Sequence, residues 1–407
     1  MEGIHRKKAY AVLGAAAGIN LVSGMLYIWG IISRTLIDQL GWSSKQASLP
    51  YTLATVSFVI AMVIFGRIQD QKGPRWTATI GVILMGGGAI LSGLKTEPVF
   101  VAIAFGLIAG SGIGILNVST TPPAMKWFPK EKKGMVTGVV VGGVSVSSMM
   151  YSPLANWLNQ SYGVAAVFLV VGGISLVIGM ILAQVLKNPP ETPASKQTVL
   201  ERAQSLNDHN WQEMLRSPKF WVIWLMLALS SSAGLMVIGH VVSIAKVQAG
   251  WAGGFLLVML LALFNTFGRF GGGSLSDKLG RLNLIRGIFV LQMFNMLAFT
   301  YLRSVPTLAV GVAVAGMCYG AIFSVFPATI SDLYGLKHFG VNFGLMFTGW
   351  GVGGIIGPMT GAWIYDLTGQ FTTAYFVSAG LLLVALGLSF LFSRMKVGTK
   401  GTVPGDS

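Results

Sequence analysis

The amino-acid sequence predicts an all-α membrane protein with twelve transmembrane helices in two pseudo-symmetric six-helix halves. Three observations lead to this fold class: an apolar composition, a series of long apolar stretches, and one short motif that occurs twice. The chain has 407 residues, of which 53% are hydrophobic and only 10% are charged. Because a soluble globular chain is usually about one quarter charged, we expect lipid to cover most of this surface.

The apolar stretches have the length of membrane-spanning helices. A helix needs roughly 20 mostly apolar residues to cross the hydrocarbon core, whereas the strands of a membrane barrel alternate over about ten residues. The 54 glycines recur inside these stretches, where small residues let helices approach closely. We expect twelve spans, near residues 9–32, 50–69, 76–95, 98–121, 134–158, 163–186, 219–245, 251–274, 282–302, 306–330, 340–364 and 372–393.

The basic residues predict the orientation of the chain in the membrane. The formal net charge is +15, a value that also occurs in nucleic-acid-binding proteins. With the N-terminus in the cytoplasm, however, 22 of the 28 Lys and Arg residues fall in inside segments and Arg269 lies mid-span, while the outside segments hold only Arg34, Lys45, Lys95, Lys246 and Arg303. This positive-inside bias explains the charge without nucleic acid. It predicts a multi-pass inner-membrane protein with both termini cytoplasmic.

The segment 187–218 divides the chain into two parts that share a motif. It is the least membrane-like internal segment, and we predict a cytoplasmic linker here between a half at 1–186 and a half with a cytoplasmic tail at 219–407. Residues 66–75 read GRIQDQKGPR and residues 273–281 read GSLSDKLGR, so that Asp70 and Asp277 are 207 positions apart. Such duplicated halves are typical of secondary transporters.

The two motif copies predict a pair of gates between helices. A carboxylate at Asp70 or Asp277 can accept hydrogen bonds from the N-terminus of a neighbouring helix. With the basic residues Arg75 and Arg281, these aspartates would form latches that make and break during alternating access. The alternative interpretation is that both copies only cap a short loop.

Arg269 is the candidate substrate-binding residue. It is the one ionisable side chain that falls clearly at mid-membrane depth, where charges are costly and mark functional sites. Asn265 lies one helical turn before it on the same face. A guanidinium without an acidic partner can bind an anion, and its planar pair of N–H donors fits the two oxygens of a carboxylate. The alternative is an arginine held for structural reasons by backbone carbonyls or side-chain amides.

Other polar and aromatic side chains fall at a similar depth. Asn117, Ser119, Tyr27, Tyr319 and Phe323 are predicted to line the same cavity. Tyr319 and Phe323 are four residues apart and share a helix face. A further residue, His240, could carry a coupling proton, although a lone histidine in an apolar helix is more often a hydrogen-bonded packing residue.

Several stretches resemble the oxalate:formate antiporter family within the major facilitator superfamily, which includes bacterial homologues of the monocarboxylate (lactate) transporters. They are residues 214–224 (MLRSPKFWVIW), 265–281, 326–332 and 342–344. The resemblance extends over nearly the whole chain. It implies the major facilitator fold and a carboxylate-binding role for Arg269.

The sequence departs from this family pattern at two positions. Oxalate exchangers carry a second mid-membrane cation, a lysine in helix 11, where Trp350 stands here. One cation suits one carboxylate, so the departure favours monocarboxylates. Animal monocarboxylate transporters place an aspartate one turn before the helix 8 arginine, where Asn265 stands here, so the resemblance supplies no acid for proton coupling.

These observations together predict a secondary transporter of small monocarboxylates of the lactate, pyruvate or formate class. A proton is the expected cosubstrate, carried by His240 or with the acid itself, and a monomer is expected. One alternative is an oxalate/formate-type anion exchanger, and another is a carboxylate-sensing membrane receptor that signals through 187–218. The sequence has no Gly-rich phosphate loop, no metal-spaced Cys and His residues and no ATP-binding motif, so we expect neither an enzyme nor a cofactor.

Overall fold

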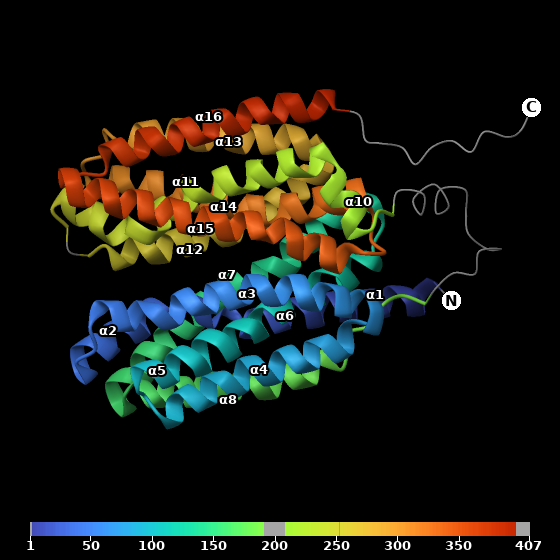
Figure 1. The fold of residues 1–407 in the computed structure, drawn as a ribbon, viewed down its shortest axis with the longest axis horizontal. Coiled ribbons are helices and arrows are strands. Elements are labelled where there is room, and N and C mark those ends of the chain that lie inside the picture. The colour runs from blue at the N-terminus through green and yellow to red at the C-terminus, as the bar shows by residue number, and fades with distance from the viewer. Residues whose placement is uncertain (1, 191–207, 252, 396–407) are drawn as a thin grey trace, which may run out of the picture.

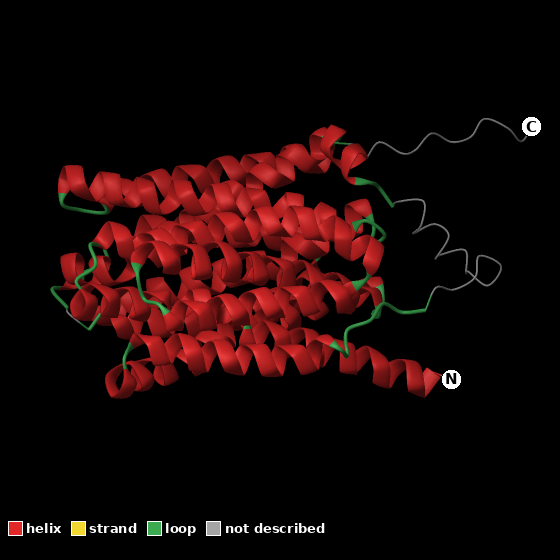
Figure 2. Cartoon of the chain, turned by 60° about the horizontal axis from the view of Figure 1, so that its bottom comes forward, coloured by secondary structure: helices red, strands yellow, loops and turns green. Residues whose placement is uncertain are grey.

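The computed structural model describes residues 2–190, 208–251 and 253–395, and every regular element in these ranges is a helix (Figure 2). The first part of the chain forms α1 (Glu2–Val22), η1 (Gly24–Ile28), α2 (Trp29–Leu40), α3 (Ser44–Lys72), α4 (Pro74–Leu94), α5 (Pro98–Val101), η2 (Ala102–Ala109), α6 (Gly110–Lys126), η3 (Lys130–Lys132), α7 (Lys133–Tyr162) and α8 (Val164–Ala183). The second part forms α10 (Trp211–Arg216), α11 (Pro218–Ala249), α12 (Phe255–Leu279), α13 (Arg281–Phe299), α14 (Val305–Tyr334), α15 (Phe339–Thr368) and α16 (Thr372–Arg394).

The described residues contain twelve helical segments that are long and apolar enough to cross a membrane. This number confirms the prediction, and each segment overlaps the expected range. Two spans are not continuous α-helices. The first changes to a 3₁₀-helix at Gly24–Ile28 between α1 and α2, and the fourth contains the π-helix Ala102–Ala109 between α5 and α6. Such irregular turns often accompany functional sites in helical proteins.

The twelve spans form two bundles that lie side by side, as the sequence predicted. In Figure 1 the helices α1 to α8 occupy one half of the molecule and α11 to α16 the other. The helices α3 and α7 of the first half face α15 and α12 of the second across the seam between them. The two halves therefore meet mainly along two helix pairs, α3 with α15 and α7 with α12.

The short helix α10 joins the second half. The Asp208 carboxylate accepts hydrogen bonds from the backbone N–H groups of Leu336 (3.1 Å) and Lys337 (3.2 Å), in the loop between α14 and α15. The backbone N–H of His209 donates to the carbonyl of Tyr334. Residues 191–207 of the expected linker lie outside the described residues, so the boundaries at 187 and 218 stay a prediction.

The start of α1 and the end of α16 lie at one end of the bundle (Figure 1). Asp70 and Asp277 also lie at this end, near the ends of α3 and α12, and we call it the motif end. Here the two halves touch through glycines. The Cβ that any other residue would carry at Gly66 or Gly273 would collide with the backbone of Gly340 or Gly134, respectively. Only glycine allows such close backbone contact.

Towards the opposite end of the bundle the two halves part. Between α3 and α15 the contacts run from Gly66 to Val59, whose side chain approaches Gly351. About two turns further out along α3, the tyrosine Tyr51 is 43% exposed. Between α7 and α12 the contacts run out to Ser145, and about one turn further out Met149 and Met150 are exposed. The described structure is therefore closed at the motif end and open at the other.

Candidate functional site

Each motif aspartate binds the first turn of a helix in the opposite half. The Asp277 carboxylate accepts hydrogen bonds from the backbone N–H groups of Gly134 (2.9 Å) and Met135 (2.8 Å), at the start of α7. The Asp70 carboxylate accepts bonds of 3.0 Å from the N–H groups of Gly340 and Val341, at the start of α15. First-turn N–H groups have no partner within their own helix and carry a partial positive charge. These bonds therefore join the halves at the motif end.

The two predicted basic gate residues differ in their contacts. Arg281 donates to the carboxylates of Asp277 and Asp332 and to the Ser276 hydroxyl. Asp332 also lies 3.6 Å from the Lys133 ammonium of the first half, so this ion pair crosses the seam. Arg75 is exposed and forms no ion pair with another described residue. Arg75 therefore takes no part in the latch in this conformation, which corrects the prediction. Lys133 and Asp332 were not identified as latch residues from the sequence.

Arg269 lies at the level where the two halves separate, and its side chain is only 2% exposed. Its Nε donates to Oδ1 of Asn265 (2.8 Å), its Nη1 to the carbonyl of Val141 (2.6 Å), and its Nη2 to the Tyr27 hydroxyl (3.1 Å). Val141 and Tyr27 belong to the first half, so this arginine bridges the seam. All three acceptors are neutral oxygens.

The charge of Arg269 has no acidic partner among the described residues. The hydrogen bonds match the structural alternative, in which carbonyl and amide oxygens hold the arginine. Neutral dipoles nevertheless leave the positive charge uncompensated, and an unpaired buried charge is costly. The site therefore still favours an anion from solution.

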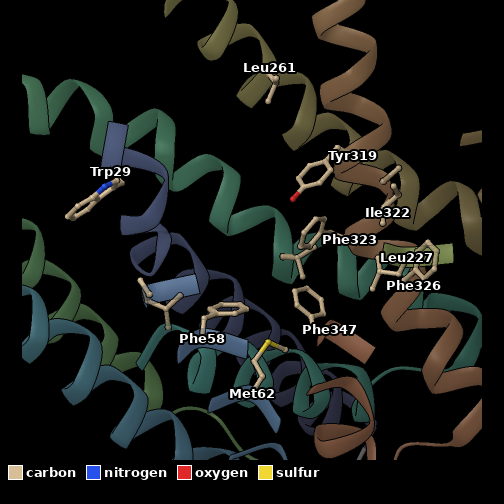
Figure 3. Packing of buried hydrophobic residues seen from close by; sticks show 14 of the residues in the cluster. Trp29, Phe58, Met62, Leu227, Leu261, Tyr319, Ile322, Phe323, Phe326 and Phe347 are labelled. Carbon is tan, nitrogen blue, oxygen red and sulfur yellow. The ribbon is translucent and has the colours of Figure 1, made fainter. Parts of the chain in front are cut away.

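Aromatic rings surround the guanidinium on the side of the second half. The Arg269 Cζ lies 4.7 Å from the ring centre of Phe323, and this ring contacts those of Tyr319, Phe347 and Trp350. Figure 3 shows Tyr319, Phe323 and Phe347 in succession, with Phe58 of α3 opposite them. These rings exclude water around the cation, which strengthens any electrostatic contact made there.

Two polar groups in this wall are hydrogen-bonded to each other. The indole Nε1 of Trp350 donates to the hydroxyl of Tyr319 at 2.8 Å. The ring of Trp350 also contacts Phe58 of the opposite half, and a substrate-binding role for Trp350 stays a prediction. No described residue accepts a hydrogen bond from the Tyr319 hydroxyl, so this O–H group is free to donate one.

The remaining polar candidates have different surroundings. Asn117 in α6 is half-buried, and its Oδ1 has no hydrogen-bond partner among the described residues. Ser119 is fully buried, and its hydroxyl donates to the Ile115 carbonyl of its own helix at 2.7 Å. The prediction that Ser119 lines the cavity stays a prediction. Asn117 remains a candidate because its amide oxygen is unused.

The structure does not bring His240 to Arg269. The ring Nδ1 of His240 lies 2.9 Å from the Met236 carbonyl of the same helix, and the ring packs 5.3 Å from that of Phe371. Gly361 of α15 is also adjacent. These contacts are typical of a hydrogen-bonded packing residue. The proton-coupling role of His240 stays a prediction.

Tyr51 is a lining residue that sequence reasoning missed. On α3 it lies seven residues, or about two turns, before Phe58, and therefore on the same helix face. Phe58 contacts Phe347 and Trp350 of the opposite half, whereas Tyr51 is 43% exposed where the halves have parted. The signal was present in the seven-residue spacing of Tyr51 and Phe58, but only the partners of Phe58 show which face this is.

A comparison with protein families decides the classification. The model of the Major Facilitator Superfamily matches residues 11–304 and 284–406. The chain belongs to this superfamily. It is accordingly a membrane transporter and not an enzyme, and the closed motif end and the buried arginine are parts of a transporter built from two six-helix halves.

Relatives and solved structures support the same fold. The chain is 28% identical to the oxalate:formate antiporter of Oxalobacter formigenes over 92% of this chain and 89% of that protein. It is 24% identical to monocarboxylate transporter 13 of Rattus norvegicus over 95% of this chain and 90% of that protein. The crystal structure of the fucose:proton symporter FucP of E. coli superposes with a TM-score of 0.72 at 14% identity, covering 94% of this chain and 98% of that one.

Proposed function

We propose that this protein is a secondary active transporter of small monocarboxylates that binds its substrate at Arg269 and works by alternating access. The observation that carries the proposal is the buried guanidinium, whose hydrogen bonds all go to neutral oxygens. A carboxylate would supply the missing negative charge. Lactate, pyruvate and formate represent the proposed class.

The hydrogen-bonding capacity of the site supports an acceptor-rich anion. A guanidinium has five N–H donors, and three of them have acceptors here. The hydroxyls of Tyr27 and Tyr319 accept bonds from Arg269 and Trp350, respectively, and each retains a proton to donate. The site therefore offers N–H and O–H donors without a facing carboxylate from the described part of the protein. A carboxylate, which when ionised only accepts hydrogen bonds, complements these donors.

A single cation supports one carboxylate group rather than two. At position 350, where the oxalate exchangers of the resembling family carry a lysine, the indole of Trp350 contacts other rings. A dicarboxylate would leave its second charge among these apolar rings, which is unfavourable. Anion exchange of the oxalate/formate type is the second candidate, favoured by the similarity to the antiporter of Oxalobacter formigenes.

The orientation and the transport cycle are also parts of the proposal. We infer that the protein lies in the inner membrane of the cell. The excess of basic residues in the inside segments then orients the motif end and both chain ends towards the cytoplasm. The structure would then correspond to an outward-open state. FucP in the outward conformation, with a TM-score of 0.70 at 15% identity, is a similar solved structure. The protein would act as a monomer, with a proton carried by His240 or with the acid.

Uptake into proteoliposomes tests the proposal. Vesicles with purified protein should accumulate labelled lactate, pyruvate or formate when the outside is acidic, and empty protein-free vesicles should not. Uptake that requires substrate inside, with no response to a pH gradient, would assign the exchanger instead. Binding of these acids without any flux would assign the receptor. No binding and no flux with any of them would contradict a monocarboxylate site at Arg269.

A further inference from the structure

A second polar cavity lies at the motif end, apart from the Arg269 site. Its volume is about 380 Å³. Its walls come from three places: the end of α3, the start of α10, and the loop that leads into α15. The lining residues are Arg67, Asp70, Gln71, Asn210, Trp211, Gln212, Lys337, His338 and Val341.

The cavity holds two cations that have no partner within the described structure. Arg67 belongs to the first half and Lys337 to the second, and both side chains are exposed. Neither the guanidinium nor the ammonium forms a hydrogen bond or an ion pair with another described residue. Asp70 also lines the cavity, but its carboxylate oxygens accept bonds from the backbone of Gly340 and Val341. Two like charges therefore face one polar space from opposite sides of the seam.

Three of the other lining side chains are neutral and can donate hydrogen bonds, while the acids Asp208 and Glu213 lie near His338. Burial, together with the neighbouring Lys337, lowers the pKa of His338 below its ordinary value, so this imidazole is neutral at pH 7. The amides of Gln71 and Gln212 add N–H donors, and neither forms a side-chain hydrogen bond with another described residue. These groups can hold an anion but do not supply one.

At the other helix pair of the motif end, α7 with α12, an acidic side chain lies between two cations from opposite halves. The Asp332 carboxylate contacts Lys133 of the first half and Arg281 of the second. Asp332 is in the last turn of α14, whereas the last turn of the corresponding helix α6 carries Lys126. Lys126 adds a third positive charge near Asp70. At the seam of α3 with α15, Lys126 thus stands where the other seam has an acid, and the nearby Asp208 carboxylate binds the backbone N–H groups of Leu336 and Lys337 rather than the side chains of Arg67 and Lys337.

We propose that this cavity binds a small multivalent oxyanion of the phosphate type, which bridges Arg67 and Lys337 and stabilises the closed motif end. The anion would take the place that Asp332 occupies at the other seam. Since α3 separates from α15 when this end opens, the complete cavity exists only in the closed state. A ligand that binds one state shifts the equilibrium towards that state. The bound anion would therefore slow transport.

The test measures phosphate binding to purified protein in detergent, by calorimetry and by melting temperature, against potassium chloride of equal ionic strength. Inorganic phosphate should bind the wild type and raise its melting temperature. In the double variant Arg67→Gln/Lys337→Gln the affinity should fall by roughly 2- to 25-fold, since solvent screens the two exposed side chains and each exposed charge contact contributes about 1.4- to 5-fold. The matched control is Lys130→Gln, because Lys130 lies 207 positions before Lys337 in the other half, and its affinity should be unchanged.

Two further arms separate the alternatives. Phosphate binding should persist in Arg269→Met, which removes the substrate site, so this proposal and the monocarboxylate proposal fail independently. Nanodiscs distinguish the source of the phosphate group. If free phosphate stabilises the protein in phosphatidylcholine discs, the ligand is a soluble anion. If the protein is stabilised only in phosphatidylglycerol discs, and the double variant loses this effect, the ligand is a lipid headgroup. No binding from either source, or equal binding by wild type and double variant, overturns the proposal.

Discussion

Replacement of Arg269 by lysine tests the proposed site most directly. Lysine keeps the charge but has one nitrogen on a shorter chain, so it cannot reach Asn265, Val141 and Tyr27 together or present a planar fork to a carboxylate. Loss of a charge-assisted contact in a dehydrated site costs about 1.5–3 kcal/mol, which corresponds to roughly a 10- to 150-fold loss of affinity. Uptake of labelled lactate or pyruvate by Arg269→Lys should fall by this factor.

The melting temperature shows whether Arg269 serves binding or packing. The side chain is 2% exposed and its charge is not neutralised by a described residue, so its burial costs free energy. In Arg269→Met this cost disappears, and Oδ1 of Asn265 still accepts a bond from the Ser145 hydroxyl at 3.0 Å. We expect Arg269→Met to abolish uptake and to melt no lower than the wild type.

Two results would refute this reasoning. Normal uptake by Arg269→Lys would show that the planar fork is not needed for recognition. A large loss of folded protein in both Arg269→Lys and Arg269→Met would show that the three hydrogen bonds of the arginine serve the packing of the two halves. Both variants should therefore be measured side by side with the wild type.

Four further predictions concern other residues of the transporter. Trp350→Lys adds a second cation beside the site and should shift competition from pyruvate towards oxalate; an unchanged preference would place position 350 outside the substrate contacts. If His240 carries the coupling proton, His240→Ala should abolish pH-driven uptake but keep substrate counterflow, and loss of both would indicate packing. Tyr51→Phe removes a hydroxyl from the open side of the site, so the apparent affinity for pyruvate should fall several-fold without a change in melting temperature; equal affinities would exclude contact with substrate. Asp277→Asn weakens the bonds to α7, so engineered cysteine pairs across the motif end should cross-link more slowly than in the exposed control Asp38→Asn, and equal rates would argue against a latch.

Much of the fold was predictable because the signal is local. A membrane-spanning helix satisfies its backbone within one segment, so the spans could be located from apolar length alone. The depth of Arg269 and the phase of Asn265 on the same helix face follow from counting along α12. Arg75 shows the limit of such counting. It matches Arg281 in the motif, yet its side chain is exposed, while Arg281 contacts Asp332 from another helix.

By itself, the sequence determined the helical fold class, the duplicated motif and the one cation at mid-membrane depth, because each depends on residues close together in the chain. Only the tertiary structure decided which groups those residues meet. Asp70 binds the start of α15, 270 positions away, and Arg269 binds Tyr27 across 242 positions. The burial of Ser119 and the exposure of Tyr51 were decided in the same way. Contacts at such separations depend on how whole helices pack, and a one-dimensional pattern of apolar and polar residues leaves that choice open.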